Sequence, residues 1–386
     1  MEVLRHLRPN RRVKSLNPRR LRRWEAVALA AGFAAFVLCA APAEAQRRGR
    51  AEPAPAPSVQ WPVKVREHVD LWFHGFALIQ DDTTAIPLFD RDYRQQITVL
   101  KNSRVLYTPF DSAQEFLSTR LKERPDLNGA QFVALYFGTW EDLVQAFDYF
   151  IKAEGDPRRS NNRDVQTIIG LLSGYFPRPA DRVFAQRFIA ALEGERMQFH
   201  REWWLAERRV REPALAAADS LWQRSWRPAI QRFLNHTQQP SGDIILSLTL
   251  GGEGRALPAG KTTNQFALGW PRTAATAEEL LFAFAHEAIG STAQVAVNDH
   301  LTPAQQRTGD AARYASAGLV RGGALLVERV EPGMGARYAR WYLAQMGRVA
   351  SAEDTAALAA LADAFPMPVE MLETIQRQIN LAFTGI

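Results

Sequence analysis

Apolar side chains recur at helical spacing over most of the chain, so that one face of each segment is suited to pack on a core. Capping residues and prolines mark where many of these segments begin and end. The pattern predicts helices over residues 112–121, 139–153, 164–175, 180–211, 215–235, 276–297, 312–330, 334–346, 352–364 and 368–383. We therefore expect a predominantly helical protein.

Two shorter segments have the composition of strands. Residues 243–250 are rich in aliphatic side chains and end at two glycines, and residues 264–270 end at a proline. Residues 63–79 fit both periods, and we expect a helix in their second half. Residues 97–107 are predicted to be a strand or an irregular lead-in. Together these elements predict an α+β fold with a small sheet.

The first 45 residues differ in composition from the rest. A lead-in with nine arginine and lysine residues precedes an apolar run over residues 26–41, and Ala43 and Ala45 are the small residues that a signal peptidase requires. The run is shorter than the roughly 20 residues that cross a bilayer. We expect a signal peptide over residues 1–45 and export to the periplasm or the exterior; an uncleaved anchor is the alternative.

The positive charge of the chain belongs to this leader. The formal net charge is +6, but residues 1–45 hold nine of the 47 basic residues and three of the 41 acidic ones. The remainder is balanced, which argues against nucleic acid as a partner. Cys39, the single cysteine, also lies in the leader, so the mature chain has no thiolate. We expect a peptide or protein partner and no integral membrane segment after cleavage.

The remaining chain divides by composition. Residues 46–60 are rich in Arg, Ala and Pro, which is typical of a disordered linker. Residues 61–239 are expected to form a mainly helical N-terminal region, whose large aromatic side chains fill a core. Residues 240–386 contain both predicted strands and form the C-terminal region.

The segment from Phe284 to Gly290, FAHEAIG, matches part of a zinc-binding motif. In HExxH, two histidines four residues apart lie on one helical face and hold zinc, and the glutamate beside the first activates the bound water. His286 and Glu287 match the first histidine and the glutamate. Gly290 stands in place of the second histidine and has no side chain to coordinate a metal.

With two predicted strands before it and another helix after it, this segment resembles the catalytic core of gluzincin-type zinc metallopeptidases, over residues 240–330. The resemblance implies a zincin-like core with the small sheet packed on the His286-Glu287 helix. It also implies an edge strand that binds substrate backbone and a glutamate ligand on the later helix. Residues 314–321 of that helix contain no carboxylate, and Glu328 and Glu331 are the nearest acidic residues.

We therefore expect an exported zincin-like protein of metallopeptidase ancestry with an incomplete zinc site and no peptidase activity. One alternative is an active metal-dependent hydrolase in which Glu287 is catalytic and His286, His300 and Glu328 form a non-standard ligand set. Another is a helical binding or scaffold protein of the cell envelope. The cofactor is accordingly zinc or none.

Two other segments, residues 68–74 and 251–254, are expected to have structural roles. His68, Asp70 and His74 lie close together in the sequence, and at helical spacing the last two share a face. Buried polar groups usually find hydrogen-bond partners, so structural roles are the simpler interpretation. Residues 251–254, Gly-Gly-Glu-Gly, lack the spacing and the lysine of a phosphate-binding loop, and we predict a turn there.

Overall fold

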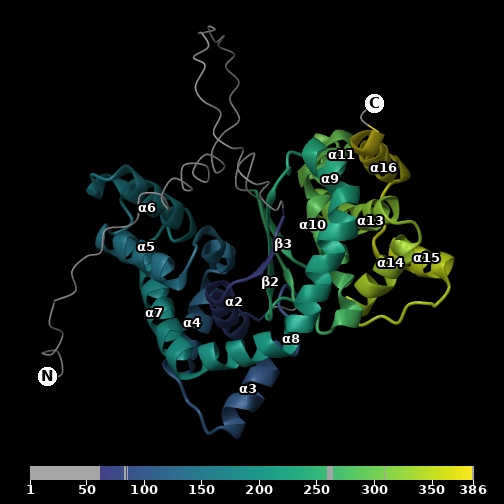
Figure 1. The fold of residues 1–386 in the computed structure, drawn as a ribbon. Helices are drawn as coiled ribbons and strands as arrows, with labels where there is room; N and C mark the ends of the chain where they lie inside the picture. The colour runs from purple at the N-terminus through teal and green to yellow at the C-terminus, as the bar shows by residue number, and fades with distance from the viewer. Residues whose placement is uncertain (1–60, 82–83, 85, 259–263, 308, 385–386) are drawn as a thin grey trace, which may run out of the picture.

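The computed structural model describes residues 61–81, 84, 86–258, 264–307 and 309–384 (Figure 1). The expected signal peptide and linker, residues 1–60, lie outside these residues. Of the described residues, 72% are helical, and four strands form one mixed sheet. The prediction of a predominantly helical α+β fold is confirmed.

The N-terminal half packs helices around α2, whose residues from His68 to Ile79 are all buried. Helices that follow α2 in the sequence contact it on several sides. These elements are α2 (Glu67–Ile79), α3 (Tyr93–Ser103), α4 (Pro109–Glu123), η1 (Pro125–Tyr136), α5 (Trp140–Lys152), η2 (Pro157–Arg159), α6 (Arg163–Tyr175) and α7 (Pro179–Glu195).

One long helical stretch joins the two halves, and Figure 1 shows its middle part, α8, passing from one to the other. Phe188 and Phe199 belong to the N-terminal core, whereas Trp204 and Trp222 belong to the C-terminal core. The change of core therefore falls within this helix, earlier than the change in sequence composition at residue 240. The stretch consists of α7, the π-helical turn η3 (Arg196–His200), α8 (Arg201–Leu221), a second π-helical turn η4 (Trp222–Trp226) and α9 (Arg227–His236).

The sheet lies between the two cores, with the order β1-β2-β4-β3. Its strands are β1 (Val63–Val65), β2 (Gly242–Ser247), β3 (Arg255–Pro258) and β4 (Asn264–Gly269). The first three in spatial order are parallel, and β3 is an antiparallel edge strand. Because side chains alternate along a strand, Ile244 and Phe266 enter the C-terminal core, while Ile245 and Ala267 enter the N-terminal core.

The predicted motif helix is interrupted. It begins after the short turn η5 (Ala274–Thr276) and consists of α10 (Glu279–Ala288) and α11 (Gly290–His300). Ile289, with φ −73° and ψ −11°, separates the two helices. Phe284 on α10 packs against Phe266 of β4, with ring centroids 4.5 Å apart, so the sheet does lie on this helix.

Five further helices complete the C-terminal half, and the predicted helices in this region are confirmed with small shifts at their ends. They are α12 (Pro303–Arg307), α13 (Asp310–Val330), α14 (Met334–Gln345), α15 (Asp354–Ala364) and α16 (Val369–Thr384). α13 contacts α10, α11, α14 and α16. Its close approach depends on Gly322, where a Cβ would lie 2.9 Å from Ile289.

The prediction of a strand or irregular segment at residues 97–107 was wrong, because α3 occupies most of it. The buried residues of α3 are Tyr93, Ile97 and Lys101, at regular four-residue spacing. The apolar stem of the lysine takes a core position, which hides the helical period from a count of hydrophobic residues. The next helix, α4, begins three residues before its predicted start at residue 112, and Thr108 and Asp111 form its capping box.

One helical stretch, Ala274–His300, is long and apolar enough to cross a membrane by length and composition. However, 67% of its most apolar window is buried inside the protein, as in an ordinary core helix. α15 and α16 pass the same test only as a pair bent by 119°. The described residues therefore contain no clear integral membrane segment.

Candidate functional site

His286 is buried on α10, and its two ring nitrogens face different partners. Nδ1 lies 3.2 Å from the hydroxyl oxygen of Tyr338, and Nε2 lies 3.9 Å from Oε1 of Glu253, which is too long for a hydrogen bond. The ring also stacks on Tyr342, with centroids 5.3 Å apart and planes at 25°. Burial lowers the pKa of His286 to about 4, so the imidazole is neutral at pH 7.

Glu253 reaches this histidine from the glycine-rich turn between β2 and β3. The turn is tightly enclosed: a Cβ at Gly252 would lie 2.4 Å from Gln345, and a Cβ at Gly254 would lie 2.6 Å from a backbone oxygen of β4. The hydroxyl of Tyr342 donates a hydrogen bond of 2.6 Å to Glu253. A third of the Glu253 side chain is exposed, which places its carboxylate at the boundary with solvent.

The carboxylate of Glu287 is bound by the edge strand. Its Oε2 accepts the backbone N–H of Ala256 at 2.7 Å, and the N–H of Gly254 also donates to it. Burial raises the pKa of Glu287 to about 7; these two hydrogen bonds oppose the rise, and the nearby charge of Glu253 adds to it. A carboxyl group that titrates near neutral pH is the kind of group that acid–base sites use.

Tyr338 and Tyr342 lie one turn apart on α14, with their rings stacked at 16°. Burial raises the pKa of both hydroxyls above the usual range, so both are neutral donors at pH 7. Neither these tyrosines nor Glu253 were predicted from the sequence as site residues. The available signals were a single acidic residue between glycines, and two tyrosines four positions apart on a predicted helix.

The structure does not bring the other two predicted ligands to His286. His300, at the end of α11, lies 2.9 Å from the hydroxyl of Thr374 on α16. Glu328 accepts the backbone N–H groups of Gly333 and Gly335, because the start of α14 needs acceptors for its free N–H groups. In the part of the chain that the structure describes, no three His, Cys, Asp or Glu side chains form a group that could hold a metal ion.

Gly290 stands at the position of the second histidine of the motif, and Gly323 on α13 packs closely against His286. A Cβ at Gly290 on α11 would contact Leu319 at 3.6 Å. A Cβ at Gly323 on α13 would lie 3.4 Å from Cα of His286 and 2.7 Å from the hydroxyl of Tyr338. The tyrosine hydroxyl therefore fills the space beside Gly323. The donors around His286 do not fit the three-ligand zinc site of a zincin.

The polar residues of α2 have structural partners. His68 Nε2 lies 3.0 Å from the carbonyl oxygen of Phe137. Asp70 accepts hydrogen bonds from the backbone N–H of Leu248 at 2.9 Å and the indole N–H of Trp204 at 2.7 Å. Asp70 thus connects α2 to the end of β2 and to α8, which supports the structural interpretation.

His74 belongs to a buried ion-pair network in the N-terminal core. Its Nδ1 lies 2.8 Å from the hydroxyl of Tyr93, and its Nε2 lies 3.0 Å from Glu195. Glu195 also accepts hydrogen bonds from Lys101, at 3.1 Å, and from Thr108. Burial alone would raise the pKa of Glu195, but His74 and Lys101 outweigh it and hold that pKa at about 2. His74 is therefore a structural residue, as predicted.

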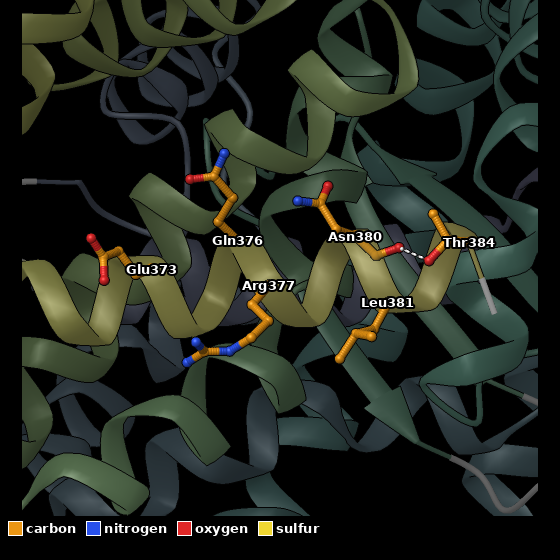
Figure 2. A pocket seen from close by; sticks show the side chains of 6 residues that line it. All are labelled: Glu373, Gln376, Arg377, Asn380, Leu381 and Thr384. Carbon is orange, nitrogen blue, oxygen red and sulfur yellow. Dashed lines mark hydrogen bonds between the residues drawn. The ribbon is translucent and has the colours of Figure 1, made fainter. Parts of the chain in front are cut away.

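The surface grooves lie away from these groups. One of about 420 Å³ follows the outer face of α16, where the side chains are mostly polar (Figure 2). Its lining residues are Glu373, Gln376, Arg377, Asn380, Leu381 and Thr384. Another of about 440 Å³ lies along α8, beside Leu205 and Arg208. Neither groove contains a buried titratable group, so neither offers chemistry comparable to that around His286.

Comparison with known proteins returns no match to a protein-family model, a curated protein or a solved structure.

Proposed function

We propose that this chain is an exported zincin-like protein of metallopeptidase ancestry, with an incomplete zinc site and no peptidase activity. The leader pattern of residues 1–45 supports export to the periplasm or the exterior. The helix bearing His286 and Glu287, packed beside the antiparallel edge strand β3, supports the ancestry. The partner that we propose is a peptide or a protein.

The environment of His286 carries the proposal. A catalytic zinc needs three protein ligands and an open position for water. Here the Nδ1 atom is 3.2 Å from the hydroxyl of Tyr338, and Gly290, at the position of the second ligand of the motif, has no side chain. The neutral, buried ring of His286 connects α10 to α14, as a core side chain does.

The contacts of Glu287 support the same conclusion. As the general base of a zinc peptidase, this carboxylate would have to meet a metal-bound water. In this chain it accepts the backbone N–H groups of Gly254 and Ala256 and so fastens α10 to the outer edge of β3. We infer that Glu287 has a structural role, in which it accepts a backbone N–H of the edge strand that no other strand of the described residues pairs.

Metal analysis and peptide cleavage by the processed chain test this proposal. We expect no stoichiometric zinc and no cleavage of a mixed peptide substrate, with the same result in these two assays for Glu287→Gln and the unmodified protein. His300→Ala is the matched control, because that histidine bonds to α16 and not to the site. One zinc per chain, together with cleavage that disappears in Glu287→Gln, would overturn the proposal.

A second candidate, a metal-dependent hydrolase with a non-standard ligand set, is favoured by Glu253. This carboxylate lies 3.9 Å from Nε2 of His286, while Tyr338 holds the other ring nitrogen as an orienting group does in metal sites. Bound transition metal that is lost in Glu253→Gln, with an unchanged fold, would select this candidate over the first.

A further inference from the structure

The C-terminal end of α3 projects from the N-terminal half at the lower edge of the molecule in Figure 1. The turn that follows it carries large apolar side chains that the protein does not cover. Val105 is 94% exposed and Tyr107 is 71% exposed, and Val99 on the last turns of α3 is 60% exposed. We call residues 102–107 the α3 tip.

The backbone of the α3 tip is strained at its most exposed apolar residue. The N–H of Leu106 donates to the carbonyl of Lys101, and the N–H of Val105 donates to that of Asn102. This pair of bonds ends a helix with one residue in the left-handed region, a position that glycine usually takes. Val105 occupies it with φ +51°, although a β-branched side chain is disfavoured there.

Nothing within the described protein offsets this strain, because the Val105 side chain is almost fully in solvent. A strained residue that is not compensated by packing points to a functional role for its side chain. Burial of Val105 in an apolar phase outside the protein would supply the missing compensation.

The α3 tip itself carries one charged side chain, the basic Arg104. Residues 93–110 contain Arg94, Lys101 and Arg104 and no acidic residue, in a chain whose charges balance once the leader is set aside. Lys101 is buried against Asp111 and Glu195, and Arg94 pairs with Asp81. Arg104 is therefore the basic side chain beside the exposed valine and tyrosine.

We propose that the α3 tip contacts a lipid surface with anionic headgroups, inserting Val105 and Tyr107 at the interface while Arg104 meets lipid phosphates. A narrow convex projection suits insertion between headgroups better than a flat protein interface, which buries many residues on each side. Tyrosine is favoured at membrane interfaces because its ring is apolar and its hydroxyl polar. One small tip gives weak, reversible binding that falls as salt rises.

A local probe tests this inference, because the apolar run of the leader can itself bind vesicles. In the full chain with Cys39→Ala, Asn102→Cys carries an environment-sensitive dye at the tip, leaving the valine and tyrosine in place. We expect a blue shift of the dye on vesicles of phosphatidylcholine and phosphatidylglycerol, and little on phosphatidylcholine alone. The double change Val105→Asp and Tyr107→Asp should weaken the response at least about tenfold.

Two further variants keep the test decisive. Val105→Gly removes the apolar group and relieves the backbone strain, so it should weaken the lipid response while keeping the fold. A dye at Val349→Cys, a fully exposed valine between α14 and α15, should show no shift. An unchanged response in Val105→Gly would overturn the inference. So would equal shifts at both dye positions, or a shift at the tip that appears only with a protein partner.

Discussion

Each core of this protein contains a buried histidine that faces a glutamate, yet the two sites are built differently. In the N-terminal core, His74 lies 3.0 Å from Glu195, and Lys101 lies 3.1 Å from the same carboxylate. In the C-terminal core, His286 lies 3.9 Å from Glu253, whose side chain is partly in solvent. The first site is a closed network of direct bonds, and the second is open on one side.

The pKa values follow this difference. Glu195 is in contact with Lys101 and His74, and these contacts hold its pKa at about 2 despite burial. The hydrogen bonds to the carboxylate of Glu287 come from the backbone N–H groups of Gly254 and Ala256. Burial raises the pKa of Glu287 to about 7. A buried carboxylate with its cation is a structural element, whereas one that titrates near pH 7 retains the character of a reaction site. This contrast supports the proposal that His286 and Glu287 descend from a reaction site.

The largest expected effect breaks the closed network. Glu195→Ala removes one of the two carboxylates that contact the buried Lys101 and the partner of His74 Nε2, so it should lower the free energy of unfolding by about 3–5 kcal/mol. Glu253→Ala, at the partly exposed counterpart, should cost about 1 kcal/mol or less. Denaturant unfolding of both variants makes the comparison. Equal losses would mean that the two sites do not differ as described.

The pH dependence of stability should separate His286 from Glu287. The folded pKa of Glu287 is raised to about 7, so its contribution is present below its ordinary pKa of 4.5 and is lost as pH rises to 7. Relative to the unmodified protein, Glu287→Gln should therefore gain up to about 3 kcal/mol between pH 4.5 and 7, at about 1.4 kcal/mol per pKa unit. Unfolding at fixed pH steps measures this gain.

His286 should show the opposite slope. Its folded pKa is lowered to about 4, so its contribution is present above the ordinary value of 6.5 and is lost as pH falls toward 4. A neutral replacement, His286→Gln, should gain on the unmodified protein as pH falls through that window. Parallel slopes for the two single variants would contradict the assignment of their charge states.

Replacing Gly323 or Gly290 by alanine should change the stability of the protein in opposite directions. Gly323→Ala places a methyl group 2.7 Å from the hydroxyl of Tyr338 and should cost about 1–3 kcal/mol. Gly290→Ala meets Leu319 at an ordinary 3.6 Å and gains helix propensity, so it should stabilise by about 0.5–1 kcal/mol. Thermal unfolding of the pair measures both. Stabilisation by both alanines would show that the hydroxyl does not fill the space beside α13.

The smallest effect concerns one hydroxyl in each core. Tyr342→Phe removes the bond to the partly exposed Glu253 and should cost about 0.5–1.5 kcal/mol. Tyr93→Phe leaves a nitrogen of the fully buried His74 without its partner and should cost more, about 1–3 kcal/mol. Denaturant unfolding measures both losses. A larger loss for Tyr342→Phe than for Tyr93→Phe would contradict the assignment of the closed network to the N-terminal core.

Much of the fold could be predicted from sequence, because long amphipathic helices have a strong period. α3 was missed because a lysine stem occupies one of its core positions, and β3 because four residues ending in a proline give no alternating pattern. The placement of His286 and Glu287 on a helix beside a sheet was also predictable. Their partners Tyr338 and Glu253 were not, since those contacts depend on how α14 and a glycine-rich turn pack.

The predicted ligands His300 and Glu328 show a second limit. Both lie within or near the segment that resembles a zincin core, but each side chain forms hydrogen bonds to other parts of the fold. Glu328 supplies acceptors to the start of α14, and His300 bonds to Thr374 on α16. A hydrogen-bond requirement a few residues away, or on a neighbouring helix, is not visible in the spacing of metal-binding residue types.

The central claim is that His286 is held by Tyr338 and not by zinc. Native mass spectrometry of the processed chain, with and without added zinc, tests it most directly. We predict a zinc-free mass for the unmodified protein and for His286→Ala and His300→Ala alike. One zinc per chain in the unmodified protein, lost in His286→Ala and kept in His300→Ala, would contradict the account.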